Sequence, residues 1–406
     1  MKKIIPFFAL IALLSCSKDY KFDENDFNIF SGIGRTNSYE QFGKFAFQIV
    51  NNEPIESSDS SGVIQTAIRL KSPYSIIANS KGKILRINNT TVDKSFSIDS
   101  NFVVASGMCA DKNSNIYFIS SNDELYCIDF NLDLKWKKDI QVKKSHSLSF
   151  SDLIATNSGV IVGANTGELL KYNFDGEIAW KYESSLAIPK TFAADSLDYL
   201  YIPITNNEFG TTDSLACIDN NGKLVWQTEL KETRVLSSSA YRNGRIYISG
   251  AKLQSDEKTG ITFCLDRNGK ILWKNEIPIL GRFVSVDYDN NCYVLATSSG
   301  IGEIKSGAFA YNNEGKEIWN VYLGAAATSP LIISQKYLGF TAFTGEGAAM
   351  YFLRKNDGLM VKFHSLANFP PLYLQAYISD DCSIKLFGSS KLTTVKFSET
   401  FLNKLF

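Results

Sequence analysis

Short apolar runs alternate with turn-forming residues along most of the chain. Roughly every 8–12 residues, Gly, Asn, Asp and Ser interrupt apolar runs of about five residues, as in proteins built from short strands. No long stretch has apolar residues at the spacing of an amphipathic helix. The pattern therefore predicts an all-β protein.

The segment around Ala216–Leu230 shows the basic unit most clearly. An apolar run ends at Ile218, the turn Asp219–Gly222 follows, and a second run begins at Leu224. Two apolar runs joined by an Asp, Asn and Gly turn predict a β-hairpin. Gly222 can adopt the positive φ that such a turn requires. The same unit recurs at Thr262–Ile277 and Phe309–Leu323.

Two more candidate strands precede each hairpin. They are Pro189–Ala194 and Tyr199–Ile204 in one copy, and Val235–Ala240 and Arg245–Gly250 in the next. Four short strands per repeat are typical of a β-propeller blade.

The five tryptophans mark the period of this repeat. They are spaced by 44, 46, 47 and 46 residues, which indicates a repeat architecture. Four of them end a motif with Asp or Asn seven residues earlier and Gly four residues earlier. The fifth, Trp136, keeps Asp129 but has Leu132 in place of Gly. The motifs are Asn173–Trp180, Asp219–Trp226, Asp266–Trp273 and Asn312–Trp319.

This signature resembles the tryptophan-docking repeat of the pyrroloquinoline quinone (PQQ)-type propellers. That family includes quinoprotein alcohol dehydrogenases and BamB-type scaffolds of outer-membrane protein assembly. The resemblance covers roughly residues 42–398. It implies that each Trp packs between neighbouring blades, against the turn of the next blade. It does not by itself separate enzymes from scaffolds.

Weaker copies extend the series and set the expected number of blades. Phe363, Phe96 and Phe47 each place a flat ring near the position of a Trp, at distances close to the repeat period. Eight positions predict an eight-bladed propeller, with seven blades as the alternative because two of the copies are weak. The positions are Phe47, Phe96, Trp136, Trp180, Trp226, Trp273, Trp319 and Phe363.

The two ends of the repeat region complement each other. Three strand-like runs, Leu372–Ser379, Ser383–Ser389 and Leu392–Phe397, follow the last copy without an outer strand. Residues 43–50 are an outer strand with no blade before them. We therefore expect the N-terminal strand to complete the C-terminal blade, because closure removes two exposed sheet edges.

The N-terminus resembles a bacterial lipoprotein signal. Lys2 and Lys3 precede the apolar stretch Ile4–Leu14, which is too short to span a membrane. The segment ends in Leu-Leu-Ser-Cys, so residues 1–15 are interpreted as the signal peptide and Cys16 as the lipidation site. Residues 16–41 are polar and predict a flexible tether, and 42–406 form the propeller.

Charge and cysteine content narrow the range of functions. The chain has 42 basic and 42 acidic residues and no basic stripe, so nucleic-acid binding is disfavoured and membrane contact is expected only through the Cys16 lipid. Cys127, Cys217 and Cys264 share one place in three repeats and are interpreted as small buried apolar residues. Neither adjacent cysteines nor a Cys-x-x-Cys pair occurs.

Candidate catalytic and metal-binding residues have simpler explanations. His146 and His364 are the only histidines, and no catalytic partners can be assigned to them. Asp111–Asn115 and Asp287–Asn291 have alternating oxygen ligands as calcium loops do, but they lie at expected turns, where Asp and Asn are favoured anyway. No catalytic residue, metal or cofactor is therefore predicted.

Three functions are compatible with these features. The favoured one is a non-catalytic, lipid-anchored scaffold, similar to BamB-type factors, that binds another envelope protein or peptide. The second is a surface or periplasmic receptor for a small ligand or glycan in the central funnel, and the third is a quinone-dependent dehydrogenase. We expect a monomer in the bacterial cell envelope, with the outer membrane as the favoured location and either side of it possible.

Overall fold

The computed structural model describes most of the chain between Asn37 and Ser398. The described residues are 37–38, 46–54, 64–70, 74–88, 91–99, 102–145, 148–188, 192–205, 212–237, 239–253, 259–299, 304–327, 329, 331–333, 337–344, 347–365, 375–378, 384–388 and 391–398. Every regular element among them is a β-strand. This part of the chain accordingly contains no helix of the length and apolarity needed to cross a membrane.

The described strands form eight sheets, most of them four antiparallel strands in chain order. The first three sheets are β3 (Ile64–Arg69), β4 (Tyr74–Asn79), β5 (Lys83–Asn88) and β6 (Thr91–Ser97); β7 (Cys109–Ala110), β8 (Ile116–Ile119), β9 (Glu124–Ile128) and β10 (Leu134–Asp139); and β11 (Ile154–Ala155), β12 (Val160–Gly163), β13 (Glu168–Tyr172) and β14 (Ile178–Glu183). The next three are β15 (Ala193–Ala194), β16 (Leu200–Ile204), β17 (Ser214–Ile218) and β18 (Leu224–Glu229); β19 (Thr233–Val235), β20 (Ala240–Arg242), β21 (Arg245–Lys252), β22 (Gly260–Asp266) and β23 (Ile271–Ile277); and β24 (Gly281–Val286), β25 (Cys292–Ser299), β26 (Ile304–Tyr311) and β27 (Glu317–Leu323). The last two are β1 (Asn37–Ser38), β28 (Ala326–Ala327), β29 (Ile332–Ile333), β30 (Tyr337–Thr344), β31 (Gly347–Arg354) and β32 (Met360–Ser365); and β2 (Ala46–Pro54), β33 (Gln375–Ile378), β34 (Ile384–Gly388) and β35 (Lys391–Ser398).

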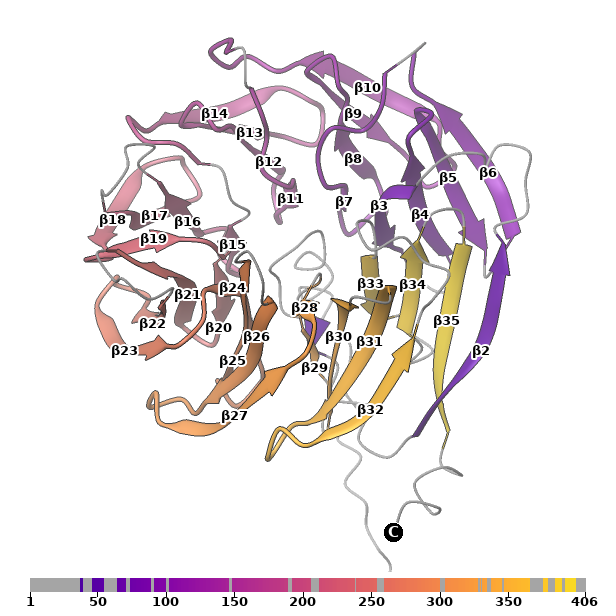
Figure 1. The fold of residues 1–406 in the computed structure, drawn as a ribbon. Coiled ribbons are helices and arrows are strands. Elements are labelled where there is room, and N and C mark those ends of the chain that lie inside the picture. Colours follow the sequence, from indigo (N-terminus) through magenta and orange to yellow (C-terminus); the bar gives the residue numbers. More distant parts are fainter. Residues whose placement is uncertain are drawn as a thin grey trace, which may run out of the picture.

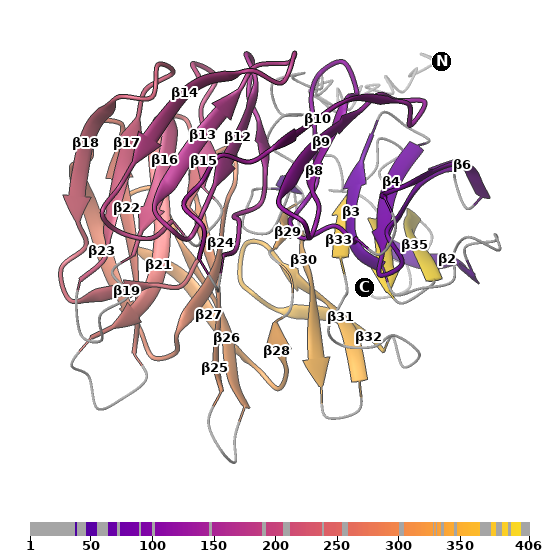
Figure 2. The ribbon, with the colours of Figure 1, turned by 90° about the horizontal axis from the view of Figure 1, so that it is seen from above.

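The sheets stand around a common centre like the blades of a propeller (Figure 1), as the sequence predicts. Short strands such as β7, β11 and β15 lie on the inner side, and long strands such as β10, β14 and β18 lie on the outer side. In the perpendicular view, the strands of successive sheets run roughly along one direction (Figure 2). In a four-stranded meander the first and third turns lie at the same end of the sheet, and we call this end of the ring the turn face.

The N-terminal strand completes the last sheet, which confirms the expected closure. β2 pairs antiparallel with β35, and Phe47 lies opposite Phe397. The indigo β2 and the yellow β35 lie side by side in Figure 1 although they come from opposite ends of the sequence. The pairing has one irregularity, between Ile49 and Asn51, and runs on to Pro54, four residues beyond the predicted strand.

The inner strands differ from the sequence prediction. The predicted strands Pro189–Ala194 and Val235–Ala240 are shorter or divided: β15 has only two residues, and β19 and β20 pair separately with β21. Asn37–Ser38, inside the predicted tether, form β1 and pair in parallel with β29. Strands of two or three residues carry too little hydrophobic periodicity to be recognised from sequence.

The core lies between the sheets. Middle strands such as β8 and β16 are buried on both faces, because each sheet packs against a neighbour on either side. Outer strands such as β10, β14 and β18 instead alternate between exposed and half-buried residues. The apolar runs in the sequence are therefore middle strands, and the alternating segments that hold the tryptophans are outer strands.

Candidate functional site: the joints between blades and a pocket beside one of them

Each of the five tryptophans docks on the turn of the following sheet. The indole nitrogen donates a hydrogen bond to a carbonyl in the third turn of the next sheet, and the five bonds are 2.7–3.2 Å long. The donor–acceptor pairs are Trp136–Phe174, Trp180–Asn220, Trp226–Arg267, Trp273–Asn313 and Trp319–Lys355. A polar anchor on a large ring fixes both the position and the tilt of each joint.

The glycine of each motif lies directly beneath the tryptophan of the preceding sheet. A Cβ atom on Gly269 would be 2.6 Å from the Trp226 ring, and one on Gly315 would be 2.5 Å from the Trp273 ring. Their φ angles are +78° and +82°, values that side chains with a Cβ rarely adopt. The glycine therefore serves the turn and the close approach of the ring at once.

At the joint between the β3–β6 and β7–β10 sheets, other groups take the places of the Trp, of the Gly and of the indole N–H that binds the turn. Phe96 stands where a Trp would stand, and Leu132 occupies the glycine position with φ at +64°. Leu132 is buried in the cluster against which Phe96 packs, so a larger side chain accompanies the smaller ring. Phe96 has no N–H, and Arg86 Nη1 instead donates to the Phe130 carbonyl over 2.8 Å. This carbonyl is the counterpart of the one that each Trp binds.

Arg86 is held in place by its surroundings. Its Nε and Nη2 atoms donate to the two carboxylate oxygens of Asp93, at 2.9 and 3.0 Å. The guanidinium carbon lies 4.4 Å from the centre of the Phe130 ring and 5.1 Å from that of Tyr74. The hydrogen bond to Asp93 is the main reason why the pKa of Arg86 is raised. No sequence motif marks the pair of Arg86 and Phe130, and the one local sign of it is that Phe96 has no N–H to bind the turn.

Replacing Arg86 with Gln is therefore expected to weaken this joint. The Phe130 carbonyl and Asp93 lose a charge-assisted partner, which should cost about 1–3 kcal/mol of unfolding free energy. Chemical denaturation measures the loss. The control is Lys94→Gln, which removes the same charge from an exposed residue paired with Arg86 across the sheet. Equal effects of the two substitutions would show that Arg86 does not stabilise the joint.

The acidic residues of two calcium-like loops are engaged in their own turns. Asp111 Oδ1 accepts hydrogen bonds from the backbone of Asn113 and Asn115, and Oδ2 accepts from the Asn115 amide and the Tyr117 hydroxyl. Asp287 makes the same four bonds within its own loop, and Asp195 likewise accepts from two turn amides and Tyr201. Turn chemistry explains these loops, as the sequence predicts.

Cations from the next sheet cap two of these carboxylates. Arg267 Nη2 lies 2.5 Å from Asp195 Oδ2, and Lys355 Nζ lies 2.8 Å from Asp287 Oδ2. Both carboxylates are fully buried, and each cation offsets part of the free-energy cost of burying the charge. These ion pairs join residues far apart in the sequence and could not be predicted from it.

The described cysteines lie in the interior of the protein. Cys109, Cys127, Cys217, Cys264 and Cys292 are all buried. Burial raises the pKa of the Cys127 and Cys264 thiols to about 11 and that of Cys217 to about 12. The thiols of Cys127, Cys217 and Cys264 therefore stay protonated at neutral pH and are poor nucleophiles.

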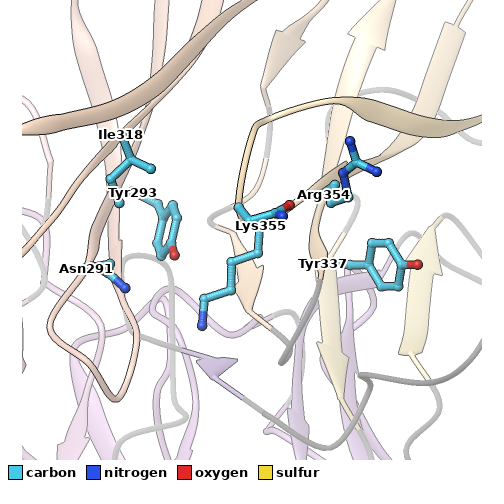
Figure 3. A pocket seen from close by; sticks show the side chains of 7 residues that line it. Asn291, Tyr293, Ile318, Tyr337, Arg354 and Lys355 are labelled. Atoms are coloured by element: carbon cyan, nitrogen blue, oxygen red, sulfur yellow. The ribbon is translucent and has the colours of Figure 1, made fainter.

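A pocket opens on the turn face between the β24–β27 sheet and the β28–β32 sheet. Its volume is about 550 Å³, within the usual range for small-ligand sites. Lys355 extends between Tyr293 and Tyr337, and Ile318 lies at one side (Figure 3). The lining residues are Asn291, Tyr293, Ile318, Tyr337, Arg354, Lys355 and Asn356.

Comparisons with known proteins agree with this geometry. A family model described as outer membrane protein assembly factor BamB matches residues 211–358. The structure of BamB from Moraxella catarrhalis superposes with a TM-score of 0.63 at 14% identity, covering 87% of this chain and 98% of that one. The chain is a PQQ-like β-propeller repeat protein.

Dehydrogenases share the fold of this PQQ-like propeller as well. A europium-containing methanol dehydrogenase superposes with a TM-score of 0.64 at 10% identity, covering 87% of this chain and 88% of that one. A quinohemoprotein alcohol dehydrogenase from Pseudomonas putida gives 0.60 at 11% identity, with 93% and 77% covered. At these identities the likeness concerns the fold alone. No curated protein matches the chain.

A quinone with a bound metal ion would need a group of metal-ligating side chains. Within the described ranges, no three His, Cys, Asp or Glu residues are grouped so that they could hold a metal. The carboxylates most like calcium ligands, Asp111 and Asp287, already accept hydrogen bonds on both oxygens. The adjacent cysteines that many quinone enzymes of the family carry are missing from the sequence.

Some predicted site residues lie outside the described residues, and others lie in strands for which only the backbone pairing is described. Cys16 and His146 lie outside the described residues. Phe47 and Phe363 lie in the strands β2 and β32, opposite Phe397 and Tyr351. His364 is also in β32, opposite Met350. The lipid anchor and the packing of Phe47 and Phe363 therefore stay predictions.

Proposed function

We propose that this protein is a non-catalytic, lipid-anchored propeller of the cell envelope that binds another protein as a scaffold. The observation that carries the proposal is the match of residues 211–358 to the BamB family model. The coverage of 98% of a BamB chain adds support, because nearly the whole length of that protein has a counterpart here. BamB-like propellers indicate protein–protein interaction and an envelope location in general terms, and the lipid anchor rests on the sequence around Cys16.

The contacts made by the buried charged side chains also support a scaffold function. The buried charged groups described above, such as Arg86, Asp195 and Asp287, bind turns or join neighbouring sheets. Such joints make a rigid ring that presents loops and turns at its faces. Loops held by a rigid framework are suited to binding a partner without large rearrangement.

The scaffold is tested with the purified, lipidated protein as bait in detergent extracts of its own envelope. We expect one or a few envelope proteins to be retained in stoichiometric amounts, and chemical cross-links should lie on one face of the ring. Recovery of the bait alone, from extracts and after cross-linking in cells, would contradict the proposal.

Substituting Cys16 with Ala is expected to abolish lipidation. The signal Leu13–Cys16 motivates this expectation, since the cysteine is the acceptor of the lipid. Labelled fatty acid should enter the wild-type protein and not the variant, and the variant should leave the membrane fraction or keep its signal peptide. Cys382→Ala is the matched control and should be labelled like wild type. A wild-type protein that takes up no label and fractionates as soluble would contradict the anchor.

A quinone-dependent dehydrogenase, the third function compatible with the sequence, is kept as an alternative because dehydrogenases are among the solved structures with this fold. The test is to add pyrroloquinoline quinone and Ca²⁺ and to measure absorbance and alcohol-dependent dye reduction. The scaffold proposal expects no bound quinone and no turnover. Stoichiometric quinone binding with turnover would favour the enzyme.

A further inference from the structure

The five outer strands that carry a docking Trp have one edge that could accept a further strand. Each of them is the last strand of its sheet and pairs with the third strand on one side. On the other side, no strand among the described residues pairs with it. The N–H and C=O groups of such an edge are complementary to one kind of occupant, because only an extended backbone supplies acceptors and donors in the same alternation.

Charged side chains protect four of these five edges. The residues one and three positions after the Trp are exposed in all five strands, and we call them the exposed pair. In four strands the exposed pair ends in Asp or Glu, and in three of these four it begins with Lys. These pairs are Lys137 and Asp139, Lys181 and Glu183, Gln227 and Glu229, and Lys274 and Glu276. A strand added to one of these edges would partly cover the charges, which is a common protection against edge-to-edge association.

In the fifth strand, β27, the exposed pair is uncharged. Asn320 follows Trp319, and Tyr322 stands where the other four strands have Asp or Glu. Tyr322 is 63% exposed, the highest value among the exposed large apolar side chains of the described residues. The one charged residue of β27, Glu317, lies before the irregularity in the pairing with β26, and the stretch Trp319–Leu323 is regular. This regular edge therefore lacks the charges that protect the other four.

The regular stretch of β27 is complementary to itself. When two copies pair antiparallel about a twofold axis at Val321, residues at equal distances before and after Val321 lie opposite each other. Val321 then meets Val321 of the second copy, and Asn320 meets Tyr322 of the second copy. A β-branched pair at the centre is favourable in a sheet, and no charge is covered on either side of it.

We propose that two copies of this protein associate edge to edge through β27, antiparallel and with the twofold axis at Val321. The two β24–β27 sheets then form one continuous sheet across the dimer. This inference goes beyond the scaffold function and does not depend on it. The dimer takes the place of the monomer expected from the sequence, because the exposed pairs can be compared only when the outer strands and their exposure are known.

The test gives β27 the charges that the other outer strands carry. The full-length mature protein is purified in detergent, and its association is followed by sedimentation velocity over a series of concentrations. We expect a monomer–dimer equilibrium for wild type and at least a tenfold higher Kd for Tyr322→Glu, because each copy then brings an acidic side chain into the pairing. Asn320→Lys should act in the same direction. Gln227→Lys is the matched control, since it makes the corresponding change in β18, and it should leave the association unchanged.

Disulfide trapping in membranes tests the register of the two strands. Chains with Asn320→Cys, produced together with chains with Tyr322→Cys, should form a linked pair, because these residues lie opposite each other across the twofold axis. Cys382 is replaced by Ser in both chains. Gln227→Cys together with Glu229→Cys, at the corresponding positions of β18, is the control and should stay unlinked.

Three results would overturn the proposal. The first is a wild-type protein that stays monomeric over the whole concentration series. The second is association of folded Tyr322→Glu and Asn320→Lys as tight as that of wild type. The third is a linked pair of the β27 cysteines that forms no faster than that of the β18 cysteines. Both β27 substitutions change exposed side chains, so the variants should fold, and circular dichroism checks this.

Discussion

Removing the strand β2 is expected to open the ring and to destabilise the whole protein. A truncation that begins at Ile55 loses the pairing with β35 from Ala46–Ser398 to Pro54–Lys391. At about 1 kcal/mol for each lost backbone hydrogen bond, the cost is on the order of 5 kcal/mol or more, comparable with the total stability of many domains. The unpaired edge of β35 would also be free to associate with other chains. Thermal unfolding and light scattering measure both effects.

Two shorter truncations serve as controls. A chain that begins at Asn37 keeps β1 and β2 and should melt like wild type, and one that begins at Phe45 loses only the short pairing of β1 with β29. If the chains that begin at Phe45 and Ile55 melt alike, β2 does not close the ring. Independent support would come from Gln48→Cys with Lys396→Cys, which face each other across the two strands. With Cys16 and Cys382 replaced by Ser, this pair should oxidise readily.

Replacing Trp226 with Ala is expected to cause the second large loss of stability. The ring rests on Gly269, and its N–H donates to the Arg267 carbonyl over 2.7 Å. Truncating a buried Trp costs about 3–5 kcal/mol, and the half-buried Trp226 should lie near the lower figure. Because each sheet depends on its neighbours, the melting of the whole ring should shift.

Control variants on the same strand separate docking from general loss of apolar area. Leu224→Ala removes a side chain that is 47% exposed and should change stability by no more than about 0.5 kcal/mol. Trp226→Phe keeps a ring without the N–H and should cost about 1 kcal/mol for the hydrogen bond in addition to the lost ring area. A melting temperature of Trp226→Ala equal to wild type would show that the docking does not stabilise the ring.

The joints explain why some predictions from sequence succeed. The Trp motif combines a turn with Gly, an outer strand and a ring that packs on the next turn, and each part leaves a local signal. Gly222 shows this: it needs a positive φ of +81° and also lies 2.7 Å, measured from an ideal Cβ, from the Trp180 ring. Two local requirements at one position make the glycine recognisable in the four Trp motifs that keep it. Closure by β2 could also be predicted, because residues 43–50 match the outer strand of a blade but no other strands of a blade precede them.

The amino-acid sequence by itself thus determined the all-β fold, the repeat period, the docking tryptophans and the closing strand, because these depend on interactions within a repeat or on periodic positions. Only the tertiary structure decided which residues from different repeats meet. Arg86 reaches the Phe130 carbonyl and Lys355 reaches Asp287 across 44 and 68 positions of sequence, with no motif to join them. The pocket beside the Arg354–Gly358 turn is lined by residues of two neighbouring sheets and depends on how these sheets pack. Such contacts are set by the relative placement of neighbouring sheets, which no local pattern in the chain encodes.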